Sequence, residues 1–212
     1  MCHLGAMKFK ELIERVTDNG LFTYGQIVSG ERRPHDLRRQ LARWVTAGKV
    51  NQLRRGVYLL NAPYARISAH PFAVANLLKK ASYVSLQSAL AHYGMIPEYV
   101  PVTTSVTTGR PEELATSIGR FQFRHVVKHR FNGFTVTDVA PGQRVLLATP
   151  HKALVDLLYL TPHSDDPDYL RELRLVPPSG FEIEKLFSVS AASGSRKVKR
   201  AVKNLVNVWK DL

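Results

Sequence analysis

Helical periodicity dominates the N-terminal part of the chain. In the segment 34–47 the apolar residues are four, three and one positions apart, so they fall on one face of a helix with 3.6 residues per turn. Gly48 follows the last turn, as a glycine at a helix end often does. The pattern predicts a helix over 34–47, with an apolar face made of Leu37, Leu41, Trp44 and Val45. Two shorter helices are predicted over 9–16 and 24–28.

Two short β-like runs, 50–53 and 57–60, follow the third helix. A tight basic turn, Arg54-Arg55-Gly56, joins them. Three helices followed by a two-stranded ribbon are the elements of a winged helix-turn-helix, a DNA-binding motif. We therefore expect a first domain over residues 8–62.

The remaining residues, 63–212, predict a second domain in which helices surround a small, mostly antiparallel sheet. Strands are expected where β-branched and aromatic runs alternate with Gly, Pro and Asn turns, at 103–107, 120–127, 134–139 and 144–147. Helices are expected at 71–78, 86–93, 150–160, 168–175, 181–187 and 196–212. Ser188 to Ser195 is small and flexible in composition. The predicted fold class of the whole chain is α+β.

The last predicted helix is strongly amphipathic. Its apolar stripe consists of Val198, Ala201, Val202, Leu205, Trp209 and Leu212. Its first half carries a cluster of basic residues, Arg196, Lys197, Lys199, Arg200 and Lys203. The cluster is either a second surface for a polyanion or a protein partner, or the solvated face of a helix that covers the core.

Charge distinguishes the two ends of the chain from its middle. The net charge is +13, of which residues 1–62 carry +6, residues 63–190 carry +2 and residues 191–212 carry +5. A basic surface attracts phosphate groups and releases their counterions, so nucleic acid is one expected partner. A solubilising surface or an acidic protein partner would give the same totals.

The basic residues of the helix over 34–47 lie opposite its apolar face. Arg39 and Arg43 are one turn apart, and the guanidinium fork suits guanine O6 and N7, so these two are the candidates for reading bases. Further DNA-binding candidates near the helix start or on its flank are Arg32, Arg33, His35 and Arg38. At the ribbon turn, Arg54 and Arg55 are candidates for phosphate or minor-groove contacts. The alternatives are a solvated arginine face and an ordinary exposed hairpin.

Enzyme motifs are absent from the sequence. It has no GxGxxG, P-loop, GxSxG or HExxH pattern, so no catalytic residue is assigned and no enzyme activity is expected. The spacing of Glu182, Glu184 and Lys185 resembles the carboxylate-x-lysine element of metal-dependent nucleases but lacks one acidic position. His125 and His129 have no carboxylate or thiol nearby to complete a metal site. No metal and no cofactor are expected.

The compartment is predicted to be the cytoplasm. Cys2 is the single cysteine, so no disulfide forms within the chain and no cysteine-based metal cluster is expected. The first ten residues lack the pattern of a secretory signal, and Met7 is a candidate native start. The longest apolar segment, 145–160, is interrupted by charged residues, so no membrane span is predicted.

Three segments of the chain resemble the AbiEi-type antitoxins of type IV toxin–antitoxin systems. They are LRRQLARWVTAGKVNQLRRGVY from Leu37 to Tyr58, YVSLQSALAHYGM from Tyr83 to Met95, and ATPHKALVDLLYL from Ala148 to Leu160. Family patterns often have an acidic residue where His151 stands here. The resemblance implies that the N-terminal domain binds inverted repeats in its own promoter and represses its operon. It also implies that the C-terminal domain counteracts a nucleotidyltransferase-like toxin, with or without direct contact.

Three other functions remain open on the sequence alone. The chain is also compatible with a winged-helix regulator that has no toxin partner and uses its second domain for oligomerisation or ligand binding. A nuclease with its site at Glu182 and Glu184 is a second alternative. A protein that only binds an acidic toxin is the third.

Overall fold

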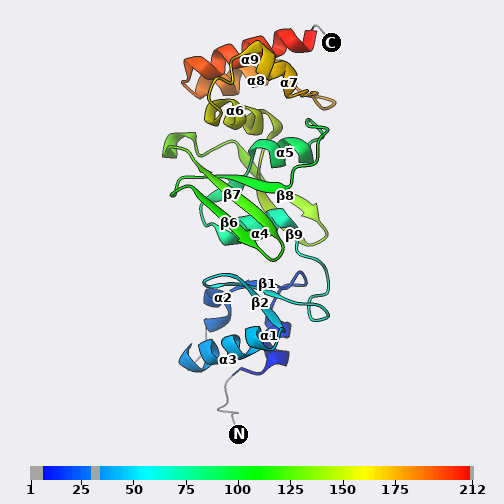
Figure 1. Ribbon diagram of the computed structural model, residues 1–212, viewed down its shortest axis with the longest axis vertical. Helices are drawn as coiled ribbons and strands as arrows, with labels where there is room; N and C mark the ends of the chain where they lie inside the picture. The colour runs from blue at the N-terminus through cyan, green and yellow to red at the C-terminus, as the bar shows by residue number, and fades with distance from the viewer. Residues whose placement is uncertain (1–6, 30–33, 211–212) are drawn as a thin grey trace. The chain divides into compact units, whose positions relative to one another are not determined.

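The computed structural model of the protein describes residues 7–29 and 34–210 and is an α+β structure (Figure 1). It divides into two compact units. The first holds the described residues up to Lys80 together with Thr116–Ile118 and Asp138–Arg144, and the second holds Ala81–Ala115, Gly119–Thr137 and the residues from Val145 onward. No helix of the described residues is long and apolar enough to cross a membrane.

The first unit combines short helices with a three-stranded antiparallel sheet, of strand order β1-β3-β2. Its elements are α1 (Phe9–Arg15), β1 (Leu21–Thr23), α2 (Tyr24–Val28), α3 (Pro34–Thr46), β2 (Val50–Arg54), β3 (Val57–Leu60) and α4 (Pro71–Leu78). The predicted helices and both predicted strands are present within one residue at each end. The sequence analysis missed β1, because three residues are too few to show an alternating pattern.

The core of the first unit forms around the apolar face of α3. Leu37, Leu41 and Trp44 are buried together with residues of α1, β1 and β3. The ring of Phe9 lies 5.3 Å from that of Trp44, measured between centroids. Thr23 caps α2 by accepting a hydrogen bond from the backbone N–H of Gln26, at 3.2 Å. The helical period of the sequence therefore identified the buried face of α3 correctly.

Most residues of a six-stranded sheet, of strand order β6-β7-β5-β4-β9-β8, belong to the second unit; the end of β6, the end of β8 and the start of β9 are counted in the first. The strands of this sheet are β4 (Ser82–Val84), β5 (Val102–Thr107), β6 (Glu112–Thr116), β7 (Gly119–His125), β8 (Phe134–Ala140) and β9 (Gln143–Ala148). The sheet is mixed: β4 pairs with β5 antiparallel, whereas β5 pairs with β7 and β4 with β9 in parallel, and the prediction of a mostly antiparallel sheet did not include these parallel pairs. Strand β6 was not predicted. It lies at the edge of the sheet and neighbours β7, which in turn neighbours β5. The sequence analysis also missed the three-residue strand β4.

Helices complete the second unit. They are α5 (Leu86–His92), the 3₁₀ turn η1 (Lys128–Arg130), α6 (Pro150–Leu160), α7 (Pro167–Glu172), α8 (Ile183–Ala192) and α9 (Arg196–Lys210). The α6 helix packs against α5 and α8, and α9 packs against α7 and α8 (Figure 1). The flexible composition of 188–195 was a misleading signal, since α8 continues to Ala192. Small side chains there, with Ser190 buried, let α8 lie close to its neighbours.

A buried ion pair within α6 is hydrogen-bonded to residues at the end of β4 and just after it. The Lys152 Nζ and Asp156 Oδ1 atoms are in contact, and both side chains are at most 5% exposed. Asp156 Oδ2 accepts hydrogen bonds from the hydroxyls of Tyr83 and Ser85, each at 2.8 Å. Burial raises the pKa of Asp156, whereas Lys152 and the hydroxyl donors lower it. All polar atoms of this carboxylate therefore have partners inside the protein.

Gly133 lies directly against this ion pair. Its φ angle of +71° lies in the left-handed region, which glycine adopts without strain. A Cβ atom at this position would lie 3.0 Å from Cγ of Lys152. A side chain at position 133 would therefore adopt an unfavourable φ angle and press on the stem of Lys152.

His151 is a buried histidine of the second unit. The ring is 5% exposed, stacks on Phe181 at 4.2 Å between centroids, and its Nδ1 is buried without a hydrogen-bond partner among the described residues. Burial lowers the pKa of His151, and Lys185 lowers it further, against the opposing effect of the Glu182 carbonyl and carboxylate. The folded state therefore favours the neutral ring.

We expect the free energy of unfolding of the second unit to fall as the solution is acidified. A histidine in an unfolded chain has a pKa of about 6.5, so the stability from neutral His151 is complete above that pH. It is lost progressively as the pH falls through the lower pKa of the folded state. Urea unfolding at several pH values measures this slope. The dependence of the unfolding free energy on pH should weaken in His151→Gln. It should persist in His129→Gln, which is the control because His129 is exposed. Equal pH dependence in the wild type and both variants would contradict the assignment to His151.

Candidate nucleic-acid interface

The exposed face of α3 carries two arginines whose contacts, among the described residues, are with side chains of the same helix. Arg39 Nη2 lies 2.5 Å from Asp36 Oδ1, and the Arg39 side chain is 75% exposed. Arg43 Nη1 donates to Gln40 Oε1 at 3.4 Å. Exposed contacts of this kind contribute little to stability, so either guanidinium can exchange its partner for a ligand at small cost. The structure places both side chains on the face opposite the apolar one, as predicted.

A groove separates α3 from the β2–β3 turn. It has a volume of about 290 Å³, and its walls include Arg38 from α3 and Arg55 from the turn. Gly56 at the turn has a φ angle of +83°, which a glycine adopts freely. The guanidinium of Arg38 lies 5.1 Å from the centroid of the Tyr24 ring. Two cationic side chains from separate elements therefore line the same groove.

The groove also contains polar side chains that the sequence analysis did not select. Tyr24, Gln52 and Tyr58 are part of its lining. Burial raises the pKa of Tyr58, and Arg38 partly lowers it, so its hydroxyl remains protonated at neutral pH. The sequence indicated only that Gln52 and Tyr58 lie near the predicted turn and that Tyr24 follows the residue that caps α2. No periodicity indicated that they would meet Arg38.

Arg54 and Arg55 are adjacent in sequence but differ in surroundings. Arg54 is half-buried, and its Nη1 donates to the backbone carbonyl of Leu78 at 2.7 Å. That carbonyl is at the C-terminal end of α4, where backbone oxygens lack helical partners. Arg55 is exposed. The turn therefore presents Arg55, whereas Arg54 is engaged within the first unit. The register shift between Gln52 and Arg54 locally changes the alternation of β2.

Three of the remaining candidates lie at or before the start of α3. Arg32 and Arg33 are outside the residues that the structure describes. His35 is exposed in the first turn of α3.

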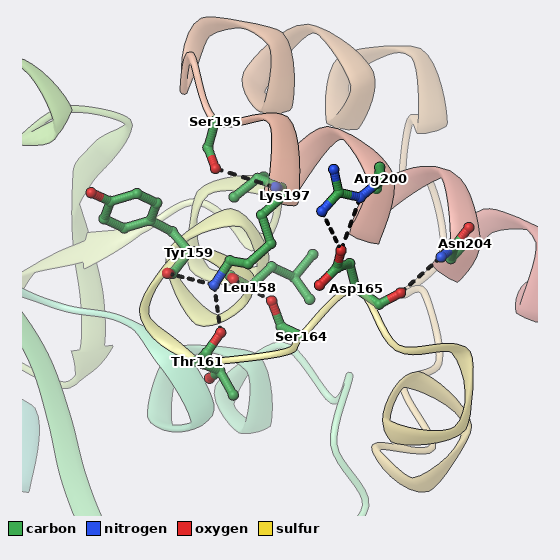
Figure 2. Close-up of polar contacts among 10 residues, drawn as sticks. Leu158, Tyr159, Thr161, Ser164, Asp165, Ser195, Lys197, Arg200 and Asn204 are labelled. Atoms are coloured by element: carbon green, nitrogen blue, oxygen red, sulfur yellow. Dashed lines mark hydrogen bonds and ion pairs between the residues drawn. The ribbon is translucent and has the colours of Figure 1, made fainter.

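Internal contacts hold part of the basic cluster of the last helix (Figure 2). Lys197 Nζ donates to the carbonyl oxygens of Tyr159, at 3.0 Å, and Thr161, at 2.5 Å. Burial lowers the pKa of Lys197, and Asp165 opposes that shift. Arg200 donates from Nε and Nη2 to Asp165 Oδ2, at 2.9 and 2.8 Å.

These contacts fix α9 to the connection between α6 and α7. Arg196, Lys199 and Lys203 are exposed. Of the five predicted basic residues, Lys197 is therefore half-buried and held by two carbonyls, whereas the other four are exposed, including Arg200, whose side chain is 64% exposed although it pairs with Asp165. Four residues of the predicted apolar stripe are buried, namely Val198, Ala201, Val202 and Leu205. Trp209 is half-buried, and its Nε1 donates to the Leu175 carbonyl at 2.6 Å. Leu212 lies outside the described residues.

Acidic side chains before α7 and at the start of α8 have partners within the protein. Asp165 binds Arg200, and the Asp166 side chain caps α7 by accepting from the backbone N–H of Asp168. Glu182 Oε1 lies 3.8 Å from Lys185 Nζ at the surface. Within the described part of the chain, no group of three or more His, Cys, Asp and Glu residues could hold a metal ion.

Comparison with known proteins provides no assignment. No profile of a protein family matches the chain, and no curated protein matches it. The candidate interface therefore rests on the groove and the exposed face of α3, and the family resemblance rests on the three segments quoted above.

Proposed function

We propose that the protein is a sequence-specific DNA-binding antitoxin that represses its own operon and counteracts a nucleotidyltransferase-like toxin. Residues 8–62 would act as a winged helix-turn-helix, and residues 63–212 as the antitoxin domain. The observation that supports DNA binding is the groove lined by Arg38 and Arg55, beside the exposed arginine face of α3. Double-stranded DNA presents the matching array of phosphates and base edges.

In this proposal α3 enters the major groove. Arg39 and Arg43 would read bases, because their side chains are exposed and their contacts with Asp36 and Gln40 are exchangeable. Arg55 at the β2–β3 turn would contact the phosphate backbone, with Arg38 and the amide of Gln52 as further donors. Arg54 has no part in this interface, since it binds the end of α4.

The antitoxin half of the proposal depends on the family resemblance. Two of the three resembling segments, 83–95 and 148–160, contain Tyr83, Ser85, Lys152 and Asp156, which form the buried polar cluster of the second unit. The similarity therefore includes residues that hold the second unit together as well as the proposed DNA-binding elements.

Binding to the upstream region of the protein's own gene tests the proposal. We expect this duplex to bind about 10³-fold more tightly than a scrambled duplex of equal length and composition, in the range of specific repressors. Equal affinity for both would contradict sequence-specific repression. Co-expression tests the toxin half separately: growth in the presence of a neighbouring nucleotidyltransferase gene should depend on this chain, and unchanged growth without it would contradict antitoxin activity.

A regulator without a toxin partner is the second candidate function. The observation that favours it is a cavity in the second unit, lined by Arg130 and Lys152, which could bind a small effector. Specific promoter binding, together with the absence of a toxin gene beside the chain's own, would support this candidate over the antitoxin.

A further inference from the structure

A cavity of about 180 Å³ lies within the second unit, away from the proposed DNA-binding residues. Its lining combines Arg130 of η1, Thr149 and Lys152 at the start of α6, and Ser188 and Ser193 at α8 and just beyond its end. Three segments distant in sequence thus contribute cationic and hydroxyl groups to one space. Neither the DNA-binding nor the antitoxin proposal uses it.

The lining of this cavity has an excess of positive charge. Its one carboxylate is Asp156, which already accepts from Lys152, Tyr83 and Ser85. The charge of Asp156 is therefore balanced by Lys152. The charge of Arg130 has no such counterpart in the cavity, so the site attracts an anion.

The guanidinium of Arg130 has buried donor atoms without acceptors among the described residues. Its guanidinium carbon lies 4.0 Å from the centroid of Tyr159, another residue of the lining. Its Nε and Nη1 atoms are buried, and in the described part of the chain neither has a hydrogen-bond acceptor. Buried charged donors are nearly always paired in folded proteins. An acceptor from outside the chain, entering with a small adjustment of the guanidinium, would meet this requirement.

The start of α6 adds to the positive potential. Thr149 caps the helix, and the backbone N–H of Lys152 donates to its hydroxyl at 3.4 Å. Backbone N–H groups at a helix N-terminus favour negative charge, and α6 begins at the wall of the cavity. The helix end supports the inference from Arg130 and Lys152, which would stand without it.

We propose that this cavity binds a tetrahedral oxyanion, as free phosphate or as the terminal phosphate of a small metabolite. A cavity of about 180 Å³ is large enough to admit a phosphate group. It is smaller than the roughly 300–1,000 Å³ of sites for drug-sized ligands. The guanidinium of Arg130 supplies the planar donor that phosphate oxygens prefer.

Calorimetric titration of the full chain tests the proposal, with inorganic phosphate in one series and glycerol 3-phosphate in another. Sodium chloride keeps the ionic strength constant. We expect saturable binding at one site, weakened at least tenfold in Arg130→Met. Lys128→Met is the matched control, because Lys128 is exposed on the same turn and is outside the cavity lining. The Arg55→Ala variant should bind as the wild type does, which separates this site from the DNA-binding groove.

Each outcome of the titration bears on the proposal. Binding of the ester alone would identify a metabolite, and binding of both anions would show that free phosphate suffices. The proposal would be overturned if no saturable binding occurs up to an anion concentration of about 10 mM, which is ten times a dissociation constant of 1 mM. Equal loss in Lys128→Met, or loss in Arg55→Ala, would also overturn it. If Arg130→Met fails to fold, Ala192→Phe tests the same site, because Ala192 is an exposed residue of the cavity lining. The larger side chain should block anion binding while every charged residue of the cavity is retained.

Discussion

Replacing Asp156 with alanine should destabilise the second unit by about 3–5 kcal/mol, because it leaves the ammonium of Lys152 buried without its partner. The hydroxyls of Tyr83 and Ser85 lose their common acceptor in the same variant. Urea unfolding followed by the fluorescence of Trp209, in a Trp44→Phe background, measures the effect in this unit. A loss on this scale is a large fraction of the stability of a typical domain.

Two further variants show whether burial causes this effect. Asp168 also pairs with a basic residue on its own helix, Arg171 at 2.6 Å, but both side chains are more than half exposed. Asp168→Asn should therefore cost about 0–1 kcal/mol. The double variant Lys152→Met/Asp156→Leu should recover much of the loss, since it removes both charges. Similar costs for Asp156→Ala and Asp168→Asn would show that the buried pair is not an important source of stability.

Arg39→Ala should weaken binding to the cognate upstream duplex by roughly 1–3 kcal/mol and change binding to a scrambled duplex much less. The reason is that a base-reading guanidinium contributes mainly where the correct base is present. Fluorescence anisotropy with both duplexes, at matched salt concentrations, measures the difference. An equal loss on the two sequences would make Arg39 a phosphate contact and contradict the base-reading role.

The adjacent arginines of the β2–β3 turn provide the comparison for this result. Arg55→Ala should weaken both duplexes alike and reduce the slope of log affinity against log salt by about one. Arg54→Ala should leave that slope unchanged and lower the stability of the first unit, because its side chain binds the Leu78 carbonyl. The same effect from both variants would contradict the division of roles that the structure indicates.

The sequence predicted the first unit more closely than the second, for a physical reason. In α3 the buried residues Leu37, Leu41 and Trp44 repeat with the helical period, so one local signal identifies both the helix and its core face. The strand pairings of the second unit depend on contacts between distant segments, such as Val84 with Leu147. No local pattern specifies whether such a pair is parallel, and this is why the mixed sheet was not predicted.

The candidate site shows the same limit. Exposure of Arg39, Arg43 and Arg55 could be predicted from helical period and turn position, because those are local properties. The engagement of Arg54 could not, because its acceptor is 24 residues away. Lys152 and Asp156 are four residues apart within an apolar segment, and this spacing was the available signal for a buried pair. The cavity beside them depends on η1 and α8, which approach α6 only in the folded chain.

The close fit of Gly133 against Lys152 has an evolutionary consequence. A substitution at 133 would displace the lysine stem, and a substitution of the lysine alone would leave the aspartate unbalanced. We therefore expect substitutions at these positions to be coupled. Among distant relatives, the glycine, the Lys-x3-Asp spacing of α6 and the Tyr-x-Ser at the end of β4 and just after it should be lost or retained jointly. This joint pattern should identify members of the lineage when overall similarity no longer does.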